Sequence, residues 1–159
     1  MQTQEAVKSL MTPINRVIPH LYIGNLRAAE EVDILTQYDI KKILQCTYTP
    51  IKDRYGDWIE YMSIDLADGD DDLLRYIPST NRFIHNSIQS SQNILVHCAA
   101  GVSRSASVVI AYLMAFRGES FNLSLNYLRS RRPCVDPNEY FCSQLQSLES
   151  LSYYCSLDP

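Results

Sequence analysis

The stretch HCAAGVSRS at residues 97–105 places a cysteine six residues before an arginine, with small side chains between them. An apolar run precedes it and a helix-like run follows it, so the stretch indicates a loop that enters a helix. Such a loop presents free backbone N–H groups, and the helix dipole adds partial positive charge, so the place suits an anion. Small residues let the backbone curl round that anion, and Arg104 can add two parallel hydrogen bonds to a tetrahedral oxyanion. The same field favours the thiolate of Cys98, which is a nucleophile for phosphorus.

The expected phosphate ligands are the Arg104 side chain and the backbone N–H groups of Ala99, Ala100, Gly101, Val102 and Ser103. We expect Ser105 to hydrogen-bond to the sulfur and His97 to help orient the loop. The alternative is an inert, buried cysteine, which is the usual state of a free cysteine. Cysteine and arginine at this spacing are not specific by themselves. Their combination with the apolar strand, the glycine and the helix favours the nucleophile.

The elements on either side of this loop predict where it lies. In residues 93–97, NILVH, three apolar residues follow one another before the histidine, which is typical of a central strand covered on both faces of a sheet. Residues 103–116 are apolar nearly all round, which predicts a buried helix. In α/β sheets, ligands bind beyond the carboxyl ends of the strands. Cys98 therefore follows its strand at the position where chemistry is expected.

The remaining elements predict an α/β domain with a mostly parallel central sheet. The predicted strands are residues 16–18, 21–23, 41–47 and 57–64, and the predicted helices are 26–40, 73–91, 120–132 and 137–154. The polar residues 1–15 are expected to form a loose N-terminal segment. Residues 16–155 are expected to form a single domain, since the chain length suits one core.

Composition narrows the function classes. The net charge is −4 and the basic residues are scattered, which argues against a nucleic-acid partner. The sequence has no apolar run of the about 20 residues that would span a bilayer, so no membrane partner is expected. Five cysteines without a CxxC pair predict neither a zinc site nor a disulfide framework, and the histidines show no metal-ligand spacing. A reducing compartment, the cytosol or the nucleus, is expected.

The sequence resembles the small dual-specificity protein phosphatases of the cysteine-based tyrosine phosphatase superfamily. The motif HCxxGxxRS carries the resemblance, with VIPHLYIGNLRAA, VVIAYLM and RRPCVDPNEYFCSQL, and it covers nearly the whole chain. It implies a five-stranded sheet flanked by helices on both faces. It also implies hydrolysis of phosphotyrosine and phosphoserine or phosphothreonine in protein substrates, through a cysteinyl-phosphate and without a cofactor or metal.

The resemblance also implies a general acid in the acidic loop DLADGDDD, residues 65–72. It aligns Asp68 with the aspartate that protonates the leaving oxygen, and Asp65 and Asp70 are the alternatives. In the family, an asparagine at the position of Asn138 braces the phosphate loop. The alternative for Asn138 is a turn followed by a helix cap.

Two further assignments follow from the resemblance alone. In some relatives an arginine near Arg132 binds a second phosphate on doubly phosphorylated peptides, and the alternative is a cation at a helix C-terminus. Phosphoinositide relatives carry a cysteine near Cys46 that protects the nucleophile as a redox partner. The alternative, a buried hydrophobic cysteine, is the favoured interpretation of Cys46.

Other function classes stay open at this stage. A non-catalytic phosphoprotein-binding module would keep the fold without turnover, but relatives of that kind usually lose the nucleophile, and Cys98, Arg104 and a candidate acid are all present. A phosphoinositide phosphatase would need positive charge in the loop, where this chain has Ala99, Ala100 and Val102. An RNA 5′-phosphatase is expected to have a basic surface for its substrate, and the acidic composition argues against this function.

Overall fold

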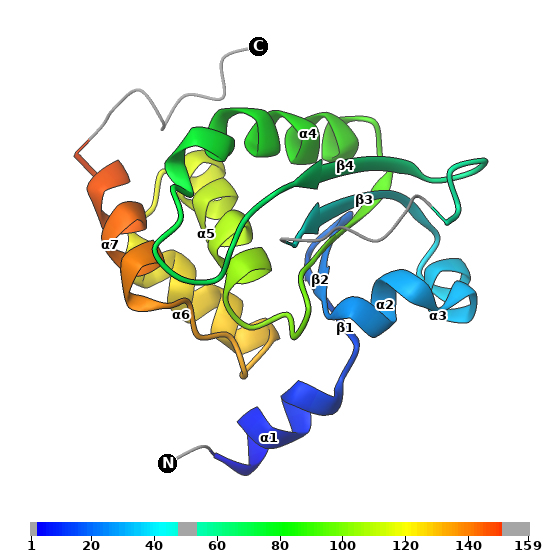
Figure 1. The fold of residues 1–159 in the computed structure, drawn as a ribbon, viewed down its shortest axis with the longest axis horizontal. Coiled ribbons are helices and arrows are strands. Elements are labelled where there is room, and N and C mark those ends of the chain that lie inside the picture. The colour runs from blue at the N-terminus through cyan, green and yellow to red at the C-terminus, as the bar shows by residue number, and fades with distance from the viewer. Residues whose placement is uncertain (1–2, 48–53, 151–159) are drawn as a thin grey trace.

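The computed structural model describes residues 3–47 and 54–150, which form an α/β fold around one five-stranded sheet (Figure 1). The strands are β1 (Ile14–Ile18), β2 (Leu21–Gly24), β3 (Ile40–Cys46), β4 (Glu60–Ile64) and β5 (Asn93–His97). Their order in the sheet is β1-β2-β5-β3-β4, with β1 antiparallel to β2 and the other neighbours parallel. The predicted mostly parallel sheet is confirmed.

Helices cover both faces of the sheet, as predicted. The helical elements are α1 (Gln4–Met11), α2 (Leu26–Glu30), α3 (Val32–Gln37), the 3-10 turn η1 (Leu74–Tyr76), α4 (Ile77–Gln89), α5 (Arg104–Arg117), α6 (Phe121–Arg131) and α7 (Glu139–Leu148). Helices α2 and α3 cover one face, while α4 to α7 lie on the other (Figure 1). None of the helices in the described ranges is long and apolar enough to cross a membrane.

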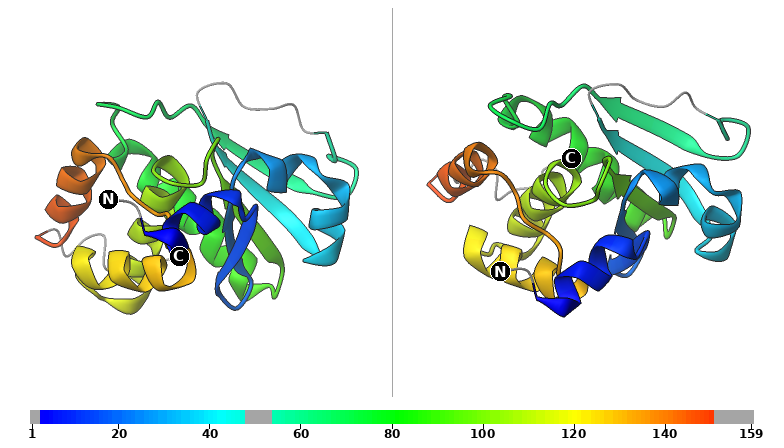
Figure 2. Two further views of the ribbon diagram at one scale, coloured as in Figure 1. Left: turned by 90° about the horizontal axis from the view of Figure 1, so that it is seen from below. Right: turned by 60° about the horizontal axis from the view of Figure 1, so that its bottom comes forward.

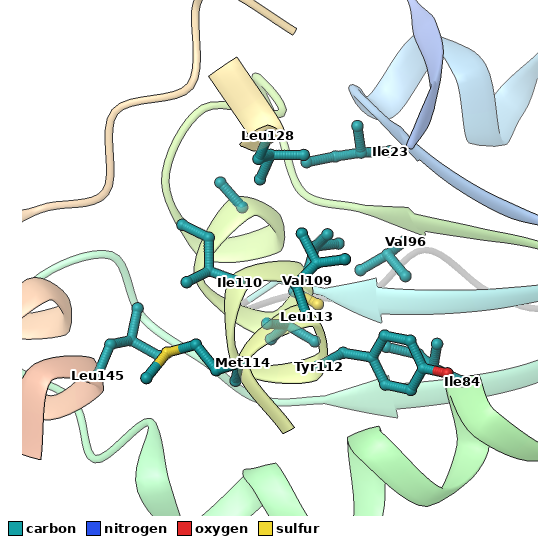
Figure 3. Packing of buried hydrophobic residues seen from close by; sticks show 14 of the residues in the cluster. Ile23, Ile84, Val96, Val109, Ile110, Tyr112, Leu113, Met114, Leu128 and Leu145 are labelled. Atoms are coloured by element: carbon teal, nitrogen blue, oxygen red, sulfur yellow. The ribbon is translucent and has the colours of Figure 1, made fainter. Parts of the chain in front are cut away.

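The core fixes both elements that flank the cysteine loop. Strand β5 is buried on both faces: Ile94 and Val96 pack into the larger hydrophobic cluster, and Leu95 packs into the smaller one under α2 and α3. Helix α5 is buried along nearly its whole length. Figure 3 shows Val109 and Leu113 of this helix among side chains from the sheet and from the neighbouring helices. The loop between β5 and α5 is therefore anchored at both ends by burial of apolar surface.

The N-terminal segment differs from the loose segment that the sequence predicts. Residues 4–11 form α1, whose first turn is capped by the Thr3 side chain, and Ser9 is buried. The Ser9 hydroxyl accepts a hydrogen bond of 3.2 Å from the backbone N–H of Cys134. Both views in Figure 2 place α1 against the connection between α6 and α7. Polarity alone suggested mobility, but a contact with residues over a hundred positions away orders the helix.

Two element boundaries also differ. The helix predicted over 26–40 is divided at Glu31, where the backbone is extended, into α2 and α3, and strand β3 already begins at Ile40. The predicted C-terminal helix is described as far as Leu148, and its last predicted residues, 151–154, lie outside the described residues. The predicted domain end at residue 155 lies there too.

Candidate active site

The loop of residues 98–103, called the nucleophile loop after the candidate nucleophile Cys98, joins the carboxyl end of β5 to the first turn of α5, as predicted. Cys98 is 2% exposed at the bottom of this loop. Its sulfur accepts a hydrogen bond of 3.2 Å from the backbone N–H of Gly101 and lies 3.2 Å from the Ser105 hydroxyl oxygen. Both groups can stabilise a thiolate, because hydrogen bonds to the charged form favour it. The N-terminus of α5 adds its partial positive charge.

Gly101 has a backbone conformation that demands glycine. Its φ is +68°, and a Cβ there would lie 2.6 Å from the carbonyl oxygen of Gly24. Any side chain would be strained by the backbone and would push the loop away from the β2–α2 junction. The glycine in the motif is therefore a steric requirement of this curl.

The loop also turns its carbonyl groups away from the phosphate position. The carbonyl of Ala99 accepts from the N–H of Leu26 at 3.0 Å, and the carbonyl of Val102 accepts from the N–H of Asp136 at 2.9 Å. In a planar trans peptide the C=O and the next N–H point in opposite directions. Binding these carbonyls to the scaffold therefore turns the following N–H groups towards the inside of the loop, where an anion can accept from them.

Asp68 is the only one of the three candidate acids that faces the same hollow as Cys98. An open hollow of about 630 Å³ is lined by both residues and by Arg104, together with Ala99, Ala100, Val102, Ser103, Asp136, Pro137, Asn138 and Glu139. Asp65 and Asp70 do not line it. The carboxylate of Asp68 accepts a hydrogen bond of 2.8 Å from the side-chain N–H of Asn138. A candidate nucleophile, a cation and a candidate acid thus meet in one place.

Asn138 realises both interpretations of its position. Its side-chain oxygen accepts from the N–H of Phe141 at 2.9 Å, which caps α7. Its backbone N–H donates to the hydroxyl of Ser103 at 3.0 Å, which connects it to the nucleophile loop. Together with the bond to Asp68, these contacts make Asn138 the link between the loop, the acid and α7.

The acidic loop has its own supports, which the sequence did not single out. The Asp71 carboxylate accepts from the N–H groups of Ala67 and Asp72, and these bonds, that of Ala67 above all, lower the pKa of Asp71. Gln144 accepts from the N–H of Leu73 at 2.8 Å and donates to the Asp71 carbonyl at 2.9 Å. The signal for Gln144 was available, since it lies three residues after Phe141 and four before Leu148, on the buried stripe of an amphipathic helix.

His97 is fully buried at the end of β5 and carries no charge at neutral pH. Burial lowers the pKa of His97 to about 4, and the nearby Arg104 acts in the same direction. The ring Nδ1 lies 3.2 Å from the carbonyl oxygen of Cys98, to which a neutral imidazole can donate. The contact restrains the residue that carries the nucleophile, in agreement with an orienting role.

Arg132 lies where a second phosphate could not reach it, which corrects the expectation drawn from the resemblance. The side chain is 0% exposed. Its guanidinium donates to the Gly101 carbonyl at 2.8 Å, the Ala100 carbonyl at 3.2 Å, and two acceptors in the N-terminal segment. The expectation failed because sequence spacing does not show on which side of the loop a residue packs. The alternative, a cation at the C-terminal end of a helix, fits its place as the C-cap of α6.

Cys46 lies beside Cys98 across the sheet. Gln45 of β3 pairs with His97 of β5, so the two cysteines follow in the same register on neighbouring strands. Cys46 is fully buried, and this burial, followed by the charge of Cys98, raises its pKa well above the usual value. Cys46 is therefore a neutral thiol in the resting protein. Within the described ranges, no group of three or more metal-ligating side chains is found.

The sequence matches the family described as "Dual specificity phosphatase, catalytic domain" over residues 21–150. The chain therefore belongs to the dual specificity phosphatase family. It is 38% identical over 140 residues to dual specificity protein phosphatase Mpk3 of Drosophila melanogaster, a match that covers 87% of this chain. The chain spans about a third of the length of that relative, since the match covers 34% of it.

Two solved structures share the fold. The crystal structure of DUSP15 has a TM-score of 0.83 at 30% identity, covering 88% of this chain and 89% of that one. The structure of the human tyrosine phosphatase-like serine/threonine/tyrosine-interacting protein also has a TM-score of 0.83, at 32% identity, covering 89% of this chain and 98% of that one. The neighbours include a protein named as phosphatase-like, so the argument for turnover depends on the residues of the site.

Proposed function

We propose that the protein hydrolyses phosphotyrosine and phosphoserine or phosphothreonine in protein substrates through a cysteinyl-phosphate intermediate. The observation that carries the proposal is the single hollow lined by Cys98, Arg104 and Asp68. These side chains have the chemistry of a nucleophile, a ligand for the phosphoryl oxygens and a proton donor. A binding module without turnover would need neither the first nor the third.

In the first step the Cys98 thiolate attacks phosphorus in line with the leaving oxygen. The S–P bond forms as the P–O bond breaks, and Asp68 gives its proton to the departing phenolate or alkoxide. Arg104 and the inward N–H groups of the loop bind the three equatorial oxygens, on which the charge of the transition state is spread. Asn138 donates to Oδ1 of Asp68, so the proton is carried on Oδ2.

In the second step a water molecule attacks the phosphorus of the cysteinyl-phosphate. The Asp68 carboxylate accepts a proton from this water, the S–P bond breaks, and inorganic phosphate leaves. Ser105, at 3.2 Å from the sulfur, donates a hydrogen bond to the thiolate that is expelled. The enzyme returns to its starting protonation state, so the cycle needs no further reactant.

The charges around the hollow favour a phosphorylated protein side chain over substrates that carry several phosphate groups, such as phosphoinositides and RNA triphosphates. Among the residues that line it, Arg104 is the one cation, and Asp68, Asp136 and Glu139 are carboxylates. A phosphoinositide headgroup or an RNA triphosphate would bring additional negative charge against these carboxylates. The same charges are expected to disfavour acidic residues beside the phosphorylated side chain.

The test is metal-independent, vanadate-sensitive release of nitrophenol from an aryl phosphate, followed by turnover on phosphopeptides, phosphoinositides and RNA 5′-triphosphate. We expect phosphopeptides to be the best substrates. Cys98→Ser should abolish turnover, and Asp68→Asn should lower it most for substrates with basic leaving groups. Asp70→Asn is the matched control, because this neighbour does not line the hollow. Full activity of Cys98→Ser, or equal effects of the two aspartate variants, would contradict the mechanism.

We also propose that the thiol is kept reduced in the cytosol or nucleus and that Cys46 can protect it. Hydrogen peroxide would oxidise the Cys98 thiolate to a sulfenic acid with release of hydroxide. Attack of the Cys46 thiol on this sulfur would then form the S–S bond, and the sulfenic hydroxyl would leave with the thiol proton as water. The shared register of the two cysteines supports the proposal, while the raised pKa of Cys46 makes the second step slow. Peroxide-inactivated wild type should recover with a thiol reductant, whereas Cys46→Ser should recover less.

A further inference from the structure

Arg132 is a cation buried behind the nucleophile loop, and no carboxylate among residues 3–47 and 54–150 pairs with it. Its acceptors at Thr12 and Asn15 each lie 2.8 Å from Nη1 and, like its two loop carbonyls, are neutral. None of the ion pairs found in the described ranges involves Arg132. A buried charge without a counterion is costly, so such a group is expected to have an anion nearby during function. The candidates are the thiols that act on its charge, Cys134 and Cys98, and the phosphate that Cys98 would attack.

The guanidinium also determines the direction of two peptide groups. It binds the carbonyls of Ala100 and Gly101, so the N–H groups of the same peptides, those of Gly101 and Val102, point to the opposite side. The Gly101 N–H does donate to the Cys98 sulfur, as this geometry requires. Ala99 and Val102 are held by backbone donors instead. One arginine thus supplies the donors for two of the four consecutive carbonyls.

Arg132 is in electrostatic contact with the nucleophile. Burial lowers the pKa of Arg132, whereas the nearby thiols of Cys134 and, less strongly, Cys98 shift this pKa upward. Interactions between charges are mutual, so the guanidinium attracts negative charge at Cys98. An arginine remains protonated even when buried, because its ordinary pKa is far above neutral pH. The charge is therefore permanent at the back of the loop.

We propose that Arg132 is a positioning residue for phosphoryl transfer, which holds the Gly101 N–H on the Cys98 sulfur, turns the Val102 N–H towards the phosphate and ties the loop to the N-terminal segment. This inference rests on the proposed phosphatase function. It extends the catalytic apparatus to the acceptors at Thr12 and Asn15, which lie outside the site itself. Loosening of the N-terminal segment is then expected to weaken phosphate binding at a distance.

The experiment compares Arg132→Lys and Arg132→Met with wild type and with Arg131→Met as the matched control. Arg131 is exposed and contacts Tyr127, so its loss should leave all measurements unchanged. We expect kcat/KM to fall on the order of 100-fold in both Arg132 variants, because small displacements of positioned groups have effects of this size. Vanadate should bind more weakly. The pH profile of Cys98 alkylation by iodoacetate should move to higher pH in Arg132→Met and stay near wild type in Arg132→Lys, which keeps the charge.

A second variant keeps the proposal testable where Arg132→Met does not fold. Asn15→Asp keeps an acceptor for Nη1 and adds a negative charge that offsets the guanidinium, so alkylation should move to higher pH and vanadate should bind more weakly. Folded variants with wild-type alkylation profiles, vanadate affinity and kcat/KM would overturn the proposal, even with a lower melting temperature. Alkylation and vanadate binding do not need turnover. If the variants show these effects but the wild-type protein hydrolyses no phosphate ester, the proposed function alone is refuted.

Discussion

Asn138 offers the sharpest test of how the acid is held, because its side chain does two separable things. It caps α7 through Phe141 and donates to Asp68 at 2.8 Å. Asn138→Ala removes both contacts, whereas Asn138→Ser keeps a good helix cap with a side chain too short to hold Asp68. The pair of variants therefore separates stability from positioning of the acid.

The expected magnitudes follow from these contacts. Loss of a cap costs about 1 kcal/mol of unfolding free energy, so Asn138→Ala should be destabilised by that amount and Asn138→Ser by much less. A hydrogen bond to a charged group contributes about 1.5–3 kcal/mol. Asp68 is exposed, so water replaces part of this bond, and the lower end applies. We expect kcat to fall by about tenfold in both variants, which corresponds to about 1.4 kcal/mol.

The assay combines urea unfolding with kcat on two substrates that differ in leaving group. Nitrophenolate leaves with little help, so nitrophenyl phosphate should show a small effect. A phosphoserine peptide releases a basic alkoxide that needs the proton of Asp68, so it should show the full decrease. Wild-type kcat of Asn138→Ser on the phosphoserine peptide would refute the role of this bond in catalysis.

Three further predictions concern the loop and the core. Gly101→Ala places a Cβ 2.6 Å from the Gly24 carbonyl oxygen at a φ of +68°, so it should cost about 1–3 kcal/mol and weaken vanadate binding, measured by urea unfolding and competition assays. A mutant protein with wild-type affinity would show that the loop can relax. His97 has its pKa lowered to about 4, so the unfolded chain takes up a proton first as the pH falls below about 6.5. Stability should therefore be complete above pH 6.5 and decline by up to about 3 kcal/mol towards pH 4, and His97→Asn should flatten this part of the curve. Leu113→Ala empties fully buried space under the sheet and should cost about 2–5 kcal/mol in urea, with a loss below about 1 kcal/mol contradicting the packing.

Some of the site could be predicted because it is built from neighbouring residues. Cys98, Gly101 and Ser105 lie within eight positions, between an apolar strand and an apolar helix. Local geometry then places the sulfur, the curl and the hydroxyl together, whatever surrounds them. Local reasoning could not select Asp68 as the acid. Several aspartates of one loop are chemically equivalent until the loop has a fixed path.

That path is a tertiary property. Asp68 is held by Asn138, seventy positions away, and the start of the next helix is held by Gln144. Neither contact leaves a pattern in the composition or the hydrophobic period of the acidic loop. The order of α1 is of the same kind, because Ser9 gains its partner only when residue 134 arrives beside it.

The sequence by itself determined the class of chemistry, the central strand, the buried helix and the nucleophile between them, because short-range spacing and burial decide these features. The tertiary structure alone decided the place of Arg132, whose guanidinium binds Gly101, 31 positions away, and Thr12, 120 positions away. The two faces of the nucleophile loop have different surroundings, and sequence spacing does not show on which face Arg132 packs. A residue that could have met a second phosphate in front of the loop is buried behind it, where its charge and its donors act on the loop itself.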